Sequence, residues 1–306
     1  MMEPVEFSFT LSEEQKKAKQ KRVAALIKQP QIKQWLKQYD QTAAFVEAHS
    51  GRFQDYCDVM KKCEHCQGIS FCRQPMTGTR MELRYDGILQ NVLVPCHYQI
   101  EQQKLYAHEK QYRQCDMPQS YLCVDLAKLD LKEESGEYKG VVMQVLQTIM
   151  DEDSSKGLYL WGKPGAGKSY LAAGMCNYFA KKKRSVSFVN VPKLISDLKM
   201  MFQEPLAMEA KLASIRHVDV LVLDDIGGES VTSWSRDDIL LPILDGRMEG
   251  KKLTIFTSNY RMQELKEKWA LGNGKQMEPM AAERLLERIS TLSTEIFVKG
   301  LSLIHI

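Results

Sequence analysis

The 306-residue sequence lacks long apolar runs and lacks any large excess of one charge. No stretch approaches the roughly 20 apolar residues that a membrane-spanning helix needs. Residues 1–10 contain no basic segment followed by an apolar one, so we expect no signal peptide, no membrane partner and a cytoplasmic location. Lys and Arg number 42 against 39 Asp and Glu. That excess is too small to indicate a nucleic-acid partner by itself.

Cysteine is almost absent from the second half of the chain. Seven of the eight cysteines lie between Cys57 and Cys123, and only Cys176 follows them. Clustered cysteines in a reducing cytosol bind metal more often than they form disulfides. The uneven distribution therefore indicates two modules of different kinds.

The periodicity of apolar residues also differs between the two modules. Residues 12–49 show helical spacing, with a capping box formed by Ser12 and Gln15. Their Lys-rich face is typical of a solvated helix, and contact with DNA or a partner is the alternative. From residue 157, short apolar strands at 158–161, 186–189, 220–223 and 253–257 alternate with helical segments. This alternation predicts an α/β domain with a mostly parallel sheet and helices on both faces.

A complete P-loop follows the first of these strands. The motif G-x-x-x-x-G-K-S consists of Gly162, Lys163, Pro164, Gly165, Ala166, Gly167, Lys168 and Ser169. Its backbone N–H groups can surround phosphate oxygens, the lysine can reach the terminal phosphates, and the serine hydroxyl can ligate Mg²⁺. The strand before the motif and the helix after it make a chance match improbable, so we expect ATP and Mg²⁺ as cofactors.

Two acidic residues end the strand at 220–223. Asp224 fits the carboxylate that holds Mg²⁺, and Asp225 is placed to orient the attacking water. Acids also cap strand ends without any catalytic role. The position of this pair about 55 residues after the P-loop favours the catalytic interpretation.

Further polar residues follow in an order that suits an ATPase. Asn259 ends the strand at 253–257 and is a candidate sensor of the γ-phosphate, although Asn is also a common turn residue. Arg284 and Arg288 lie four apart on one predicted helix, where either could act as an arginine finger in a neighbouring subunit. The alternative is ion pairing with Glu283 and Glu287.

The cysteine-rich segment has the spacing of a zinc site. Our predicted ligands are Cys63, Cys66, Cys72 and Cys96, with His97 or His65 as alternatives to Cys72. Four protein ligands would make Zn²⁺ structural, so we expect this module to bind a partner. A redox C-x-x-C pair is the alternative. We expect Cys57, Cys115 and Cys123 to be ordinary buried thiols.

The motifs GKPGAGKS, LVLDDIGGE, TSN and AERLLERI together resemble the bacterial replicative helicase loaders of the DnaI and DnaC type, over roughly residues 124–299. The resemblance implies an AAA+ ATPase that self-associates, binds the hexameric replicative helicase and delivers it onto single-stranded DNA during initiation or restart of replication. Hydrolysis would be weak and stimulated by DNA or a partner. The amino-terminal helicase-binding module of DnaI-type loaders is a zinc fold, which supports the ligand set above.

The resemblance also implies roles for individual residues. Arg288 aligns with the finger, with Arg284 as second choice, and DNA contacts come from the segments 191–202 and 228–236. The residues that would face DNA are Phe202, Thr232, Trp234 and Lys199, with Arg236 as an alternative phosphate contact. Exposed aromatic rings stack on bases without sequence preference. The alternative is that the two aromatic residues belong to the core.

These observations predict a division of the chain. Residues 1–123 form a helical and zinc-binding helicase-interaction domain, 124–156 a linker and first helix, and 157–300 the ATPase domain, while 301–306 resemble a non-native tail. The alternative functions are an IstB-like transposition helper ATPase that binds DNA and a transposase, and a metabolic P-loop kinase. No acceptor-site motif supports the kinase.

Overall fold

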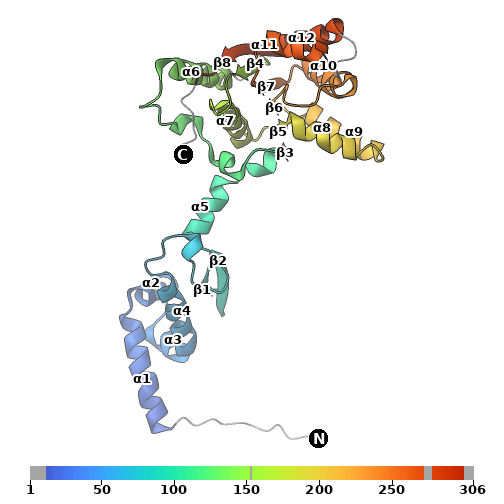
Figure 1. Cartoon of the computed structure of the whole chain (residues 1–306). Helices are drawn as coiled ribbons and strands as arrows, with labels where there is room; N and C mark the ends of the chain where they lie inside the picture. Colours follow the sequence, from blue (N-terminus) through green and yellow to red (C-terminus); the bar gives the residue numbers. More distant parts are fainter. Residues whose placement is uncertain (1–11, 152–153, 272–277, 300–306) are drawn as a thin grey trace, which may run out of the picture. The chain divides into compact units, whose positions relative to one another are not determined.

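The computed structural model describes residues 12–151, 154–271 and 278–299 (Figure 1). The predicted tail at 301–306 lies outside these residues. Contacts divide the chain into two compact units, Met1–Lys104 and Leu105–Ile306, and each is described by itself below. None of the helices in the described part of the chain has the length and apolar character to cross a membrane.

The first unit joins a helical cluster to a two-stranded antiparallel sheet. The capping box of Ser12 and Gln15 that begins α1 is confirmed. Its helices are α1 (Glu13–Lys28), α2 (Pro30–Gln38), α3 (Ala43–Ala48), α4 (Ser50–Lys62) and α5 (His97–Leu105), and its strands are β1 (Thr79–Tyr85) and β2 (Leu89–Pro95). Trp35 and Phe53 pack edge to face in the core, and the Trp35 indole donates a hydrogen bond to the Leu83 carbonyl at 2.8 Å. This bond ties α2 to the sheet.

The second unit contains a six-stranded sheet whose strands are all parallel, as the alternation of strands and helices predicted. The strand order is β3-β5-β6-β7-β4-β8. The strands are β3 (Tyr112–Cys115), β4 (Gly157–Trp161), β5 (Val186–Asn190), β6 (Val220–Asp224), β7 (Leu253–Ser258) and β8 (Ser293–Phe297). The P-loop follows β4, the acidic pair follows β6 and Asn259 follows β7, so the carboxyl ends of adjacent strands bring them to one edge.

Helices cover both faces of this sheet. Successive residues of β4 face opposite cores: Leu158 and Leu160 pack with α6 and α7, whereas Tyr159 packs with the helices of the other face. The α-helices of this unit are α6 (Gly136–Met150), α7 (Lys168–Lys181), α8 (Val191–Met200), α9 (Pro205–Arg216), α10 (Leu241–Glu249), α11 (Met262–Leu271) and α12 (Pro279–Leu292) (Figure 1). A π-helix at Trp234–Leu240 precedes α10.

Four strands and the unit boundary differ from the sequence-based expectation. The β1–β2 hairpin was not anticipated. β3 and β8 were not anticipated either, because they are edge strands of four and five residues that contain several polar side chains. β3 pairs with β5, so Tyr112–Cys115 belongs to the second unit. The boundary therefore lies at Lys104, whereas the cysteine distribution placed it at 123.

Candidate nucleotide site and cysteine cavity

The P-loop adopts a conformation that only glycine accommodates easily. Gly167 has a φ of 90° at the N-cap of α7, in the left-handed region that an L side chain disfavours. Lys168 begins α7, and its ammonium donates to the backbone carbonyls of Gly162 and Lys163 at 2.9 and 2.8 Å. Burial lowers the pKa of Lys168, while Asp225 and Asp224 oppose that change. The cation is therefore held against the loop where phosphate oxygens would bind.

The acidic pair connects to the P-loop through its first member. The Ser169 hydroxyl donates to Asp224 Oδ1 at 2.6 Å, and the Thr257 hydroxyl donates to the same oxygen at 2.7 Å. Asn190 at the end of β5 donates to Asp224 Oδ2 at 3.4 Å. A hydroxyl and a carboxylate in direct contact provide the oxygen ligands that Mg²⁺ prefers. These residues therefore fit the metal that ATP carries.

Asp225 differs from its neighbour in both backbone and surroundings. Its φ of 56° is uncommon for a residue other than glycine, and Asp is among the residues that tolerate this region. Burial and the adjacent Asp224 raise the pKa of Asp225, whereas Lys168 and Lys268 lower it. A Cβ at residue 228 would lie 2.3 Å from an Asp225 carboxylate oxygen, so a larger residue there would displace this carboxylate. The carboxylate accepts a hydrogen bond from Asn259 in its present position.

Asn259 links the two charged groups of the site. Its Oδ1 accepts a hydrogen bond from Lys168 at 3.0 Å, and its Nδ2 donates to Asp225 at 3.1 Å. The two polar atoms of one side chain therefore connect the phosphate-binding cation to the carboxylate that is suited to orient water. A bound γ-phosphate would compete for the Lys168 donor, so this side chain is placed to respond to it.

Several supporting residues were missed by the sequence analysis. Glu229 is buried, and its carboxylate accepts from the Gly227 N–H at 2.7 Å and from the Trp269 indole at 3.1 Å, which anchors the turn after Asp225. The Lys268 ammonium contacts the Tyr260 hydroxyl at 3.1 Å and its ring at 4.5 Å. Asn190 was missed as well, although its position at the end of a buried strand could have indicated a site residue.

Both finger candidates lie on α12, and within the described residues neither forms a hydrogen bond or ion pair with the P-loop of its own chain. Arg288 is partly buried and pairs with Asp245 at 2.8 Å and Glu287 at 2.9 Å, and these carboxylates raise its pKa. Arg284 is exposed and has no carboxylate within 4.0 Å among the described residues. The ion pairing with Glu283 that we considered is instead made by Lys266. Neither arginine contacts the nucleotide site described above.

The structure brings two of the four predicted DNA contacts together. Phe202 follows α8 and Trp234 begins the π-helix, and their ring centroids lie 4.9 Å apart. The Phe202 side chain is 57% exposed, so it is not a core residue, while Trp234 is half-buried against the core. Lys199 is exposed on the last turn of α8.

Thr232 and Arg236 have local structural contacts. The Thr232 hydroxyl accepts from the Ser235 N–H at 3.0 Å at the start of the π-helix. Arg236 as a phosphate contact is wrong: its side chain is buried, donates to the Trp269 carbonyl at 3.2 Å and pairs with Asp237 and Glu278. A guanidinium satisfied in this way does not face an external phosphate.

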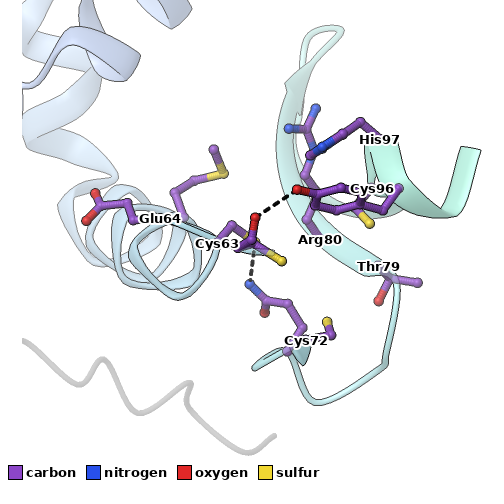
Figure 2. Close-up of a pocket in the computed structure, with 11 residues that line it drawn as sticks. Cys63, Glu64, Cys72, Thr79, Arg80, Cys96 and His97 are labelled. Atoms are coloured by element: carbon purple, nitrogen blue, oxygen red, sulfur yellow. Dashed lines mark hydrogen bonds between the residues drawn. The ribbon is translucent and has the colours of Figure 1, made fainter. Parts of the chain in front are cut away.

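All four predicted zinc ligands line one cavity of about 250 Å³ in the first unit (Figure 2). Cys63 follows α4, Cys66 and Cys72 lie in the segment between α4 and β1, and Cys96 precedes α5. The Gln74 amide donates to Cys63 Sγ at 3.1 Å, and the Gly78 N–H donates to Cys72 Sγ at 3.4 Å. His97 also lines the cavity, whereas His65 does not.

The sulfur atoms around this cavity are not gathered into a metal cluster. Within the described residues, no three His, Cys, Asp or Glu side chains are close enough together to hold a metal ion. All eight cysteines are free, so the C-x-x-C is not a disulfide here. Cys57 is buried as expected, whereas Cys123 is only partly buried and Cys115 is exposed because it lies on the edge strand β3. The donor set fits zinc in chemistry, but its assembly into a site is not observed.

The comparisons with known proteins agree with this geometry. The family described as "IstB-like ATP binding protein" matches residues 77–303. The replicative helicase loader DnaI of Bacillus subtilis (strain 168) is 28% identical over 282 residues, which cover 90% of this chain and 89% of DnaI. The replicative helicase loader DnaC of Escherichia coli (strain K12) is 33% identical over 105 residues, which cover 34% of this chain and 42% of DnaC.

A solved structure supports the same assignment. The crystal structure of DnaI superposes with a TM-score of 0.53 and 33% identity, covering 64% of this chain and 98% of that one. The family match spans more than half of the chain and contains the P-loop, the acidic pair, Asn259 and both arginines. The chain therefore belongs to the IstB-like family of AAA+ ATPases, in which it groups with the helicase loaders of the DnaI and DnaC type.

Proposed function

We propose that this protein is an ATP-dependent loader that binds the hexameric replicative helicase in the cytoplasm and delivers it onto single-stranded DNA. The observation that carries the proposal is the similarity to DnaI over 90% of the chain, which includes the first unit as well as the ATPase unit. A protein related only through its ATPase would match in the second unit alone.

The nucleotide site acts as a switch in this proposal. ATP supplies a γ-phosphate whose charge Lys168 and Mg²⁺ balance, with Ser169 and Asp224 holding the metal. Asn259 passes the presence of that phosphate to Asp225, because its amide contacts both Lys168 and Asp225. Asp225 orients the attacking water. Hydrolysis is weak without a partner, because the finger must come from a neighbouring subunit.

Self-association through the ATPase unit completes the site. Arg288 is our first choice for the finger and Arg284 the second. In one subunit Arg288 is paired with Asp245 and Glu287, so it must leave these carboxylates to reach a neighbour's phosphate. That exchange couples subunit contact to hydrolysis.

Single-stranded DNA would contact the aromatic pair. Phe202 offers an exposed ring that packs against Trp234, and base stacking needs an accessible π-face. Lys199 is exposed on the last turn of α8, three residues before Phe202, and its ammonium would contact the phosphate backbone. Thr232 would serve this surface by holding the start of the π-helix.

The first unit would bind the helicase, with Zn²⁺ stabilising its loop. The four cysteines that line one cavity support this proposal, because thiolates are the ligands that structural zinc uses most. Bonds from Gln74 and the Gly78 N–H to Cys63 and Cys72 would stabilise the thiolate form.

The second candidate is a transposition helper of the IstB type. The family name and its match to residues 77–303 favour it, since that range omits most of the helical first unit. Such a protein would bind duplex DNA and a transposase, and it would have no need of helicase contacts.

One retention experiment separates the two candidates. The full chain, immobilised through a tag, should retain the purified replicative helicase of the same organism, and a chain of residues 105–306 should not. Helicase assembled on single-stranded DNA should then increase with ATP. Failure of the full chain to retain helicase, together with retention of a transposase on duplex DNA, would establish the second candidate instead.

A further inference from the structure

Positive charge in the first unit is concentrated in its first two helices. Residues 15–39 contain eight Lys and Arg and no Asp or Glu. The rest of the first 123 residues holds nine basic and 14 acidic residues. The near-neutral total therefore conceals a segment of strong positive charge, which we call the basic helix pair (α1 and α2).

Helix geometry aligns three of these lysines on one face. At 100° per residue, Lys17, Lys21 and Lys28 lie within about 40° of one another around α1. All three are exposed, and they point away from Val23 and Leu26, which bury the opposite side of the helix in the unit. Along the helix axis, Lys17 and Lys21 are about 6 Å apart, and Lys21 and Lys28 are about 10 Å apart. Flexible lysine side chains on such a row can reach successive charges of a linear polyanion.

These cations have almost no carboxylate partners within the unit. Among the described residues, Lys16 pairs with Glu13 at 2.8 Å, and no other cation of the basic helix pair has a carboxylate within 4.0 Å. The only acids on α1, Glu13 and Glu14, lie in its first turn. Unpaired like charges on adjacent turns repel each other. A polyanion would relieve that repulsion.

The chemistry of this surface suits phosphates better than an acidic protein. Protein interfaces need an apolar or aromatic centre and are depleted in lysine. Among the described residues, no large hydrophobic side chain before Phe71 is exposed. Binding to a phosphate backbone needs only a sufficient density of cations, because released counterions supply the free energy.

We propose that the basic helix pair is a second nucleic-acid site, which binds the phosphate backbone without sequence preference. It differs in chemistry from the aromatic pair of the ATPase unit, because it offers charge and no exposed aromatic ring. The inference does not rest on the loader function, since the lysine row would bind a polynucleotide whatever the ATPase acts on.

The test uses the full chain with Lys17, Lys21 and Lys28 all replaced by Gln. The matched control replaces Lys61, Lys62 and Lys104 by Gln, which are exposed cations of the same unit outside the pair. A second variant carries Arg at 17, 21 and 28. Binding to a labelled oligothymidine and to a duplex of equal length is measured by fluorescence anisotropy between 50 and 200 mM salt.

We expect the Gln variant to bind the single strand at least about tenfold more weakly at the lowest salt, with a salt slope reduced by about two. The control and the Arg variant should bind as the unchanged protein does. The affinities of the variants for the duplex should follow the same order as their affinities for the single strand. Unchanged binding by the Gln variant, or an equal loss in the control, would overturn the proposal. Unchanged DNA binding with reduced helicase retention would assign the surface to an acidic protein instead.

Discussion

The Asn259 amide oxygen accepts a hydrogen bond from the Lys168 ammonium at 3.0 Å, although 91 residues separate them. The same side chain donates to Asp225 at 3.1 Å. One residue at the end of β7 therefore contacts the P-loop cation and the carboxylate that we propose to orient water. This arrangement makes it possible to separate nucleotide binding from hydrolysis by mutation.

Replacing Asn259 by Ala should reduce hydrolysis more than binding. The substitution leaves the P-loop intact but removes the connection between Lys168 and Asp225. We expect the rate of phosphate release to fall by about 10²-fold, as for loss of one positioned donor, with the Kd for ATP changed less than about threefold. Asn91→Ala, in the exposed strand β2, is the control. An equal loss of binding would contradict the sensor role.

Replacing Asp225 by Asn should slow hydrolysis strongly and stabilise the fold at neutral pH. Burial and Asp224 raise the pKa of Asp225. Below the unfolded-state pKa of about 3.9, the carboxyl is protonated in both states and does not oppose folding. As the pH rises through the raised folded-state pKa, ionisation lowers the free energy of unfolding. At pH 7 the ionised carboxylate therefore destabilises the fold, and the uncharged amide of Asn would not.

We expect the Asn variant to unfold at a higher temperature at pH 7, and this gain to vanish near pH 4 in calorimetry. In the unchanged protein, hydrolysis should begin to decline at a pH above the pKa of an ordinary Asp, because Asp225 becomes protonated there. The loss of rate in the variant should be about 10²–10⁴-fold. Asp238→Asn, an exposed acid of the π-helix, is the control. A lower unfolding temperature at pH 7 would contradict the pKa direction.

Subunits that carry Arg288→Ala should regain activity when they are mixed with subunits that carry Lys168→Ala. A finger acts on the nucleotide of a neighbour, so Arg288→Ala subunits keep an intact P-loop, and Lys168→Ala subunits keep an intact finger. Each alone should hydrolyse ATP at least about 10³-fold more slowly. An equimolar mixture should recover a measurable part of the rate. Arg284→Ala serves as the matched control on the same helix, and recovery that depends on Arg284 would reverse our order of choice.

Replacing Cys63 by Ser should remove zinc from the protein. The four cysteines share one cavity, so we expect one zinc per chain by elemental analysis of the purified protein. The Ser variant should lose the metal, and a chelator should lower the unfolding temperature of the first unit. Cys115→Ser, on the edge strand of the other unit, should keep it. Zinc-free wild-type protein would refute the metal assignment.

Replacing Phe202 by Ala should weaken binding to single-stranded DNA by about 1–3 kcal/mol, because one stacked base is lost. Trp234→Ala should weaken it as well, since Trp234 packs against the Phe202 ring. The measurement is anisotropy with an oligothymidine at fixed salt. Phe71→Ala is the control, because that ring is similarly exposed in the other unit. Equal affinities for all variants would exclude the aromatic surface.

The sequence by itself determined the nucleotide chemistry and most of the central sheet. The P-loop, the acidic pair and Asn259 each follow a buried strand, and parallel strands bring their carboxyl ends together, so local pattern was sufficient. The helical start of the chain was equally clear, because Ser12 and Gln15 form the capping box that their spacing predicted.

Only the tertiary structure decided which side chains are available. Arg236 and Phe202 lie in the two segments implied to touch DNA, yet the first is buried among carboxylates and the second is exposed. Spacing along the chain does not report such burial, because partners such as Glu278 are distant in sequence. The strand β3, the unit boundary at Lys104 and the double contact of Asn259 likewise depend on pairings between remote segments, which no local pattern encodes.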